Sequence, residues 1–270
     1  EAAVPSGLFE ARVDRVVPTS GAVVPAEATA AAPVRCPPEP PLAFDERPPP
    51  SATEIVHVLR EHPDQLGSAS IGSPIRGELW HGVELAEGEG ISRAGQYQWG
   101  TANVVHSIQR AVREVRRCHP GTPVLSIGDI SRKNGGWLRP HRSHQSGLDA
   151  DIGYYYSTGP AWFVRATDKN FDAERTWALV RALIEGGNVE YVFMDRSVQR
   201  LVEPVARPAL RRGVTEEDIF PGPVPHETLV RHEPGHATHL HVRFRDPAAA
   251  ALGARLSQVP KPLYASKKGH

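Results

Sequence analysis

The sequence lacks several features that mark common protein classes. Its two cysteines, Cys36 and Cys118, do not have the paired C-x-x-C spacing of a structural zinc site, and they could form one disulfide or remain two free thiols. No run of about 18 apolar residues occurs, which argues against a transmembrane helix. The formal net charge is zero, so no overall positive charge favours nucleic acid as a partner.

Proline, in contrast, is abundant and unevenly placed. Of the 26 prolines, 11 fall within residues 1–50. Because proline removes a backbone donor and fixes φ, this segment cannot sustain a helix or a central strand, and we expect an extended arm or linker over 1–50. The chain begins with Glu1 and shows no charged segment followed by an apolar stretch. We therefore expect a processed or trimmed N-terminus, which fits export.

Globular patterning starts at Ser51 and predicts a domain over 51–250, followed by a basic tail over 251–270. Ser51 and Glu54 have the spacing of a capping box at the start of a helix. Apolar periodicity and alternation predict helices over 101–117 and 171–187 and strands over 123–130, 147–154, 189–195 and 239–244. The glycine- and serine-rich stretch 67–74 is expected to be a loop. Helices and strands mix without strict βαβ repetition, which indicates an α+β fold.

The stretch 232–236 reads HEPGH and matches the H-E-x-x-H string of zinc proteases. That string binds zinc because both histidines lie on one face of an α-helix. Here Pro234 and Gly235 stand between them, and an interior proline costs a helix about 3 kcal/mol while glycine adds roughly 1. The flanks show no helical periodicity either. We therefore reject this interpretation.

The histidines that follow suit a strand. His239 and His241 alternate with Leu240, Val242 and Phe244, so the two imidazoles stand on one face above a sheet whose other face is core. Two imidazoles need further ligands from elsewhere in the chain.

The dense cluster PHRSHQSGLDADIGYY at 140–155 offers such ligands, namely His141, His144, Asp149 and Asp151. A His-Asp-His set around zinc leaves a fourth position for a water molecule, which the metal acidifies.

At these residues the sequence resembles a known group of metallopeptidases. The spacing of His144 and Asp151, followed much later by H-x-H, is that of the lysostaphin, D-Ala-D-Ala metallopeptidase and hedgehog group. Within it, IGDISRKNGG, SHQSGLDADI and HATHLHVRF resemble the penicillin-insensitive murein endopeptidases, and SIGSP and QWG also fit them. The resemblance covers roughly residues 65–246. It implies an α+β fold with a small antiparallel sheet that carries one zinc and is flanked by helices.

The resemblance also implies roles for individual residues. The zinc ligands would be His144, Asp151 and His241, while His239 and His236 match the non-ligand histidines of the family. One of these two would take the proton of the attacking water or hold the oxyanion, and a neutral histidine suits the role of general base. In the family, the histidine at the position of His141 can touch a second metal ion, but the other ligands of such a site have no match here.

Several assignments remain open between alternatives. Asp149 competes with Asp151 as a ligand, and we favour Asp149 as a hydrogen-bond partner of an imidazole N–H. Arg243 lies on the metal side by alternation, where it would bind a substrate carboxylate or form an ion pair. The aromatic residues 154–156 and Trp137 would line a groove or pack in the core and its rim, and we favour packing.

The function implied is a zinc endopeptidase of the periplasm or a secreted one. Its partner would be peptidoglycan, and it would cut the cross-link between D-alanine and meso-diaminopimelate. Two alternatives remain: a D,D- or L,D-carboxypeptidase on the same fold, and a wall-binding module that keeps zinc without turnover.

Overall fold

The centre of the molecule is a six-stranded mixed sheet. The structure is a computed structural model that describes residues 50–209, 219–220 and 228–264, together with Cys36 and Pro40. The sheet order is β4 (Ile91–Arg93), β6 (Leu125–Ile127), β7 (Asp149–Gly153), β10 (His239–Phe244), β8 (Val189–Met194) and β9 (Val230–His232). The middle strand β10 pairs antiparallel with both β7 and β8, whereas the outer pairs β4·β6 and β8·β9 are parallel.

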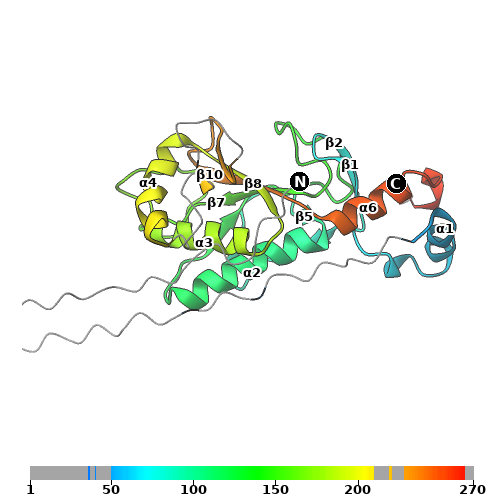
Figure 1. Cartoon of the computed structure of the whole chain (residues 1–270), viewed down its shortest axis with the longest axis horizontal. Coiled ribbons are helices and arrows are strands. Elements are labelled where there is room, and N and C mark those ends of the chain that lie inside the picture. Colours follow the sequence, from blue (N-terminus) through cyan, green and yellow to red (C-terminus); the bar gives the residue numbers. More distant parts are fainter. Residues whose placement is uncertain (1–35, 37–39, 41–49, 210–218, 221–227, 265–270) are drawn as a thin grey trace, which may run out of the picture.

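Two long helices cover one face of this sheet. Helices α2 (Ala102–Cys118) and α3 (Ala173–Glu185) run beneath it in Figure 1 and contact each other. The apolar side chains of β10 point to that face, and Leu240, Val242 and Phe244 are fully buried. Full burial of such a side chain stabilises the folded state by roughly 2 kcal/mol. Because alternate residues of a strand point to opposite faces, burying these three side chains directs the polar residues of β10 to the other face.

The remaining elements surround this core. They are α1 (Ala52–Glu61), η1 (Pro63–Gln65), β1 (Ala69–Ser73), β2 (Arg76–Trp80), β3 (Val83–Glu84), β5 (Trp99–Gly100), α4 (Arg196–Ala206), η2 (Arg207–Ala209), α6 (Pro247–Leu256) and η3 (Lys261–Leu263). Helices α1 and α6 lie together at the end of the molecule away from α4 (Figure 1). The predicted capping box of α1 is confirmed, because Ser51 and Glu54 exchange hydrogen bonds with each other's backbone N–H.

Two stretches differ from the sequence-based expectation. The predicted loop 67–74 contains strand β1, which forms a hairpin with β2. A Cβ at Gly77 would lie 2.4 Å from the carbonyl oxygen of Ser73, so a glycine allows the close approach of the hairpin strands. The tail expected from residue 251 begins inside α6, which Asp246 caps at its start and whose Leu256 is fully buried against α1.

The ends of the chain are described only in part. The arm expected over 1–50 lies outside the described residues except for Cys36, Pro40 and Pro50. Cys36 forms a disulfide with Cys118 at the end of α2, which decides between the two alternatives left open for the cysteines. Within the part of the chain that the structure describes, every helix is too short or too polar to cross a membrane.

We expect this disulfide to stabilise the fold strongly. It joins cysteines 82 residues apart, and closing a loop of that size removes chain entropy worth about 4 kcal/mol from the unfolded state. Urea unfolding of the Cys36→Ser/Cys118→Ser protein, compared with the oxidised wild type, should show that loss in the free energy of unfolding. Reduced wild type serves as the control and should match the double variant. Equal values for the oxidised and substituted proteins would contradict the expectation.

Candidate metal centre

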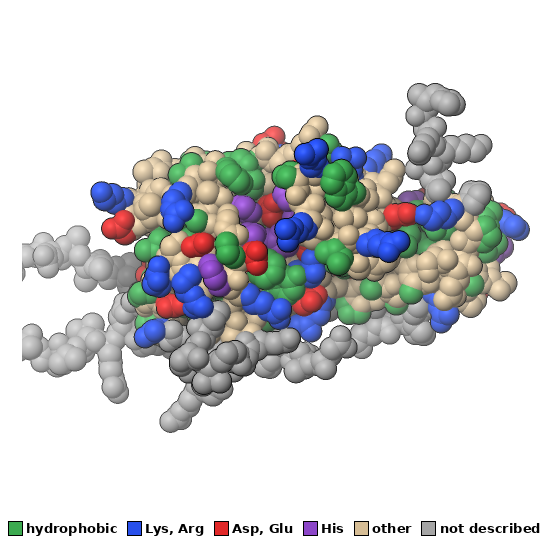
Figure 2. All heavy atoms as spheres, turned by 90° about the horizontal axis from the view of Figure 1, so that it is seen from above, with side chains coloured by type: hydrophobic (Ala, Val, Ile, Leu, Met, Phe, Trp, Pro, Cys, Tyr) green, Lys and Arg blue, Asp and Glu red, His purple; other side chains and the backbone are tan. Residues whose placement is uncertain are grey.

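The register between β7 and β10 brings the polar faces of the two predicted strands together. His241 lies opposite Asp151, and Arg243 lies opposite Asp149. Because alternate residues share a face, His239 stands on the same side as these four. This face is the one turned away from α2 and α3. Figure 2 looks onto it and shows histidine and acidic side chains gathered near its middle, with hydrophobic side chains on either side.

His144 reaches the same place from the loop before β7. Its φ is +66°, in the left-handed region that side chains other than glycine rarely adopt. The conformation is held by a hydrogen bond of 3.0 Å from its backbone N–H to Asp149. Its ring Nδ1 lies 2.8 Å from the carbonyl oxygen of Ile130. A carbonyl only accepts, so Nδ1 carries the hydrogen and Nε2 presents a lone pair to the strands.

Three donor atoms meet at one point. Nδ1 of His241 lies 3.1 Å from Oδ1 of Asp151 and 3.2 Å from Nε2 of His144, and these last two atoms are 3.3 Å apart. A tetrahedral zinc site with bonds of about 2.0–2.1 Å has ligand atoms about 3.3 Å from one another. The three side chains therefore already have the spacing of three corners of such a site, and two imidazoles and a carboxylate are donors that zinc accepts.

Asp149 lies directly behind this triangle. Its carboxylate accepts bonds of 2.7 and 2.9 Å from Nε and Nη2 of Arg243, and its Oδ1 lies 3.4 Å from Nε2 of His241. A hydrogen on Nε2 of His241 then leaves Nδ1 free to donate its lone pair to a cation. Asp149 thus lies next to an imidazole nitrogen, and its role as the partner of an imidazole N–H stays a prediction.

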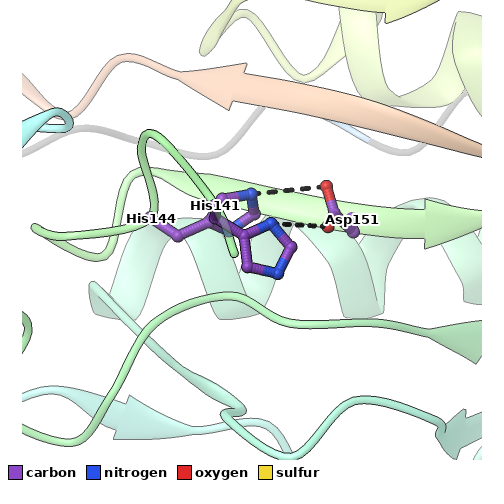
Figure 3. Close-up of side chains that lie close together, drawn as sticks. All are labelled: His141, His144 and Asp151. Atoms are coloured by element: carbon purple, nitrogen blue, oxygen red, sulfur yellow. Dashed lines mark ion pairs between the residues drawn. The ribbon is translucent and has the colours of Figure 1, made fainter. Parts of the chain in front are cut away.

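His141 adds a fourth donor to this place. It also brings in a partner, Asp129, that the sequence analysis does not single out. Figure 3 shows His141 and His144 facing the two oxygens of Asp151, and Nδ1 of His141 is 3.5 Å from Oδ2. These three residues offer ligand atoms that all lie within 4.8 Å of one another. Nε2 of His141 is 3.2 Å from Asp129. Asp129 stands in the motif IGDI, but only the folded chain shows which histidine it meets.

The charges of the centre favour a cation. Burial would raise the carboxyl pKa of both Asp149 and Asp151, but hydrogen bonds and the charges of His241 and His144 outweigh it and hold each pKa below its usual range. Hydrogen bonds from Arg243 also lower the pKa of Asp149. Both carboxylates are therefore ionised. Burial likewise opposes protonation of His241, yet its hydrogen bonds to the two carboxylates outweigh burial and raise its pKa to about 9 in the metal-free protein.

The two histidines assigned to catalysis border the triangle without entering it. Nε2 of His239 is 3.8 Å from Oδ1 of Asp151, and its Nδ1 is 2.9 Å from the hydroxyl of Thr238. Burial lowers the pKa of His239 to about 4, so the ring is neutral at physiological pH. His236 stands 5.0 Å from His239 between ring centroids, and burial lowers its pKa as well.

The H-E-x-x-H string has no helix beneath it. His232 ends β9, and the chain then turns through Gly235 at φ +92° before β10 begins. His232 is exposed and accepts a hydrogen bond from the backbone of Arg196, whereas His236 lies at the centre. The two histidines therefore do not share a helical face, in agreement with the rejection of this interpretation.

The remaining predicted residues have mixed placements. Arg243 commits two of its donors to Asp149 and stacks its guanidinium 5.2 Å from the centroid of Tyr191, so the ion-pair alternative describes its contacts, and a role toward substrate stays a prediction. The tyrosines at 154–156 are buried in the core, as favoured, whereas Trp137 is 64% exposed.

The chain is similar to known proteins over most of its length. The model of a family described as penicillin-insensitive murein endopeptidase matches residues 70–262, a range that includes every residue of the centre. A penicillin-insensitive murein endopeptidase of Haemophilus influenzae is 27% identical over 224 residues, which cover 75% of this chain and 73% of that protein.

The raised pKa of His241 predicts how the metal-free protein responds to pH. A group whose folded pKa lies above its unfolded value stabilises the fold below the unfolded pKa, and this contribution is lost as pH rises through the folded pKa. The unfolding free energy of chelator-treated protein should therefore fall by about 3 kcal/mol between pH 6.5 and 9. Denaturant titrations across that range measure it. The His241→Gln protein should lack this fall in unfolding free energy. A wild-type unfolding free energy that does not change over this pH range would show that the two carboxylates do not stabilise a proton on His241.

Proposed function

The chain belongs to the penicillin-insensitive murein endopeptidase family, and from this premise we propose that it is a zinc endopeptidase that hydrolyses the peptide cross-links of peptidoglycan. The family is one of peptidases that act on murein. The observation that supports zinc dependence is the triangle of donor atoms on His144, Asp151 and His241, with edges of 3.1–3.3 Å.

We propose these three side chains as the ligands rather than the set that contains His141. Their spacing fits a tetrahedral ion with little adjustment. Each of the two imidazoles also has its other nitrogen committed to an oxygen acceptor, His144 to Ile130 and His241 to Asp149, as metal-bound histidines commonly do. His141 is instead anchored by Asp129 and directs its second nitrogen to the outer oxygen of Asp151. We assign it to orienting that carboxylate.

A zinc ion held by these ligands would supply Lewis-acid chemistry, lowering the pKa of a water molecule and polarising the scissile carbonyl. His239 is the residue of this chain best placed to accept the proton of that water. It is neutral and it lies beside the triangle. In the tautomer whose Nδ1–H donates to the hydroxyl of Thr238, Nε2 is the base. His236 keeps a hydrogen on Nδ1, which points to the carbonyl oxygen of Glu233, and its ring centroid lies 5.0 Å from that of His239.

The substrate bond and the compartment follow from the family and from the disulfide. We propose cleavage of the amide between D-alanine and meso-diaminopimelate, the bond implied by the family resemblance. Disulfides persist in oxidising compartments, so the Cys36–Cys118 bond supports a periplasmic or secreted location. This location also places the enzyme together with its substrate.

Digestion of defined muropeptides tests the proposal. We expect the zinc-loaded protein to convert cross-linked dimers to monomers, and the His241→Ala protein to lose both stoichiometric zinc and cleavage. Mass spectrometry of the products and elemental analysis of the protein measure the two effects. His232→Ala is the matched control, because that histidine is exposed and outside the triangle, and it should behave as wild type.

Three outcomes would redirect this assignment. Removal of terminal residues from monomers, with dimers left intact, would indicate a carboxypeptidase. One bound zinc with every muropeptide untouched would indicate a binding module. Full activity in His241→Ala would exclude the triangle as the catalytic centre.

A second substitution separates proton transfer from metal binding. Replacement of His239 by Ala should lower kcat by roughly 10²–10⁴-fold, the usual contribution of a general base, while the zinc content stays at the wild-type level. Single-turnover cleavage of a dimeric muropeptide with parallel metal analysis gives both values. An activity within about threefold of wild type would assign the proton transfer to another group, with His236 the next to test.

A further inference from the structure

Phe163 combines two energetically unfavourable features, an exposed apolar side chain and a strained backbone conformation. Its side chain is 62% exposed, and the next residue, Val164, is 42% exposed, so two adjacent apolar side chains face solvent. Its φ is +58°, in the left-handed region that is an outlier for a bulky side chain. Backbone strain of this kind persists only where the surroundings impose it, and it gathers at functional sites.

The surroundings of Phe163 do impose its position. On one side, the hydroxyl of Tyr156 donates a hydrogen bond to the carbonyl of Val164, and the backbone N–H of Ala166 donates one of 2.8 Å to Ala237. On the other side, Trp162 packs on Gly128. A Cβ at Gly128 would lie 2.2 Å from the Trp162 ring, so only glycine permits this contact. The segment is thus fixed at both ends of the exposed pair.

This fixed segment lies against the candidate base. The ring of Phe163 is nearly parallel to that of His239, at 21° and 5.5 Å between centroids, and the Trp162 ring lies 6.0 Å from both. His239 is in turn 3.8 Å from the ligand oxygen of Asp151. The solvent-facing aromatic surface of Phe163 is therefore separated from the proposed metal ligands by a single side chain, the imidazole of His239.

We propose that Phe163 is a substrate-binding residue that holds the aliphatic side chain of the residue next to the scissile bond. This inference rests on the proposed function. Phenylalanine offers an apolar surface and no hydrogen-bond donor, so it selects methyl or methylene groups rather than a carboxylate. Successive residues are about 3.8 Å apart, so a group in contact with Phe163 belongs to a residue at the cleaved bond and not to the more distant glycan.

The strained φ allows a test that separates the ring from the backbone. Asn and Gly adopt the left-handed region readily, so Phe163→Asn and Phe163→Gly remove the ring while relieving the strain. We expect both proteins to melt at or above the wild-type temperature and to keep their zinc. KM for a dimeric muropeptide should rise at least about tenfold, with kcat changed less than about threefold, as expected when an apolar contact is lost. Phe163→Leu should recover most of the affinity.

The control is Val124→Ala. Val124 is 38% exposed and precedes β6, at the opposite end of that strand from Asp129, and its replacement should leave KM unchanged. An unchanged KM in both Phe163→Asn and Phe163→Gly would overturn the proposal. A fall in kcat alone would also overturn it, because that result assigns the ring to the support of His239 and not to substrate.

Binding to chelator-treated protein keeps this inference distinguishable from the proposed function. Without metal the dimer is not turned over, so calorimetry reports affinity alone, and Phe163→Asn should weaken it by about the same tenfold factor. A wild type that binds and cleaves the dimer, with Phe163→Asn equal to it, would remove the inference and leave the function standing. A zinc-loaded wild type that neither binds nor cleaves the dimer would remove both.

Discussion

The centre depends on one buried carboxylate, that of Asp149. It is completely inaccessible to solvent, and burying an unpaired charge is among the most expensive events in folding. Asp149 is paired three times, by the guanidinium of Arg243, by the backbone N–H of His144 and by the imidazole of His241. His144 lies in the loop before β7, and Arg243 and His241 lie in β10. The contacts that pair the charge of Asp149 therefore also bring the donor atoms of the triangle together.

The same pairing explains how a histidine is kept in an unfavourable backbone conformation. His144 holds a positive φ because its N–H reaches Asp149, which lies in β7, and its ring reaches Ile130, which follows β6. Phe163 is held in a similar conformation by bonds from Tyr156 and to Ala237. Both of these residues with a positive φ thus lie beside the metal centre, one as a proposed ligand and one as a proposed substrate contact.

Much of this arrangement could be anticipated from the sequence because strands have a period of two. The alternation at 239–244 placed His239 and His241 on the face opposite Leu240 and Val242, and the structure has that arrangement. The convergence of His144 with these strands came from the family resemblance, since no local pattern encodes a contact over 97 residues. Asp129 was missed for the same reason, because its partner His141 is fixed only by the tertiary fold.

The elements that were misjudged depend on contacts between distant segments. The β1–β2 hairpin has the composition of a loop, yet its glycines permit a close pairing that α6 then covers. Helix α6 continues past residue 250, where the domain was expected to end, because its leucines pack against α1, nearly 200 residues earlier in the chain. Propensity is a weak guide where tertiary burial decides the outcome.

The disulfide also determines how mechanical tension would travel through the molecule. The first 35 residues are covalently continuous with Cys36, and Cys36 is bonded to the last residue of α2. A pull on the N-terminal end therefore enters the folded body at α2, the helix that supports the sheet from beneath, before it reaches α1. Reduction of that one bond would reroute the force through α1, so the redox state of the compartment decides which part of the enzyme resists being pulled.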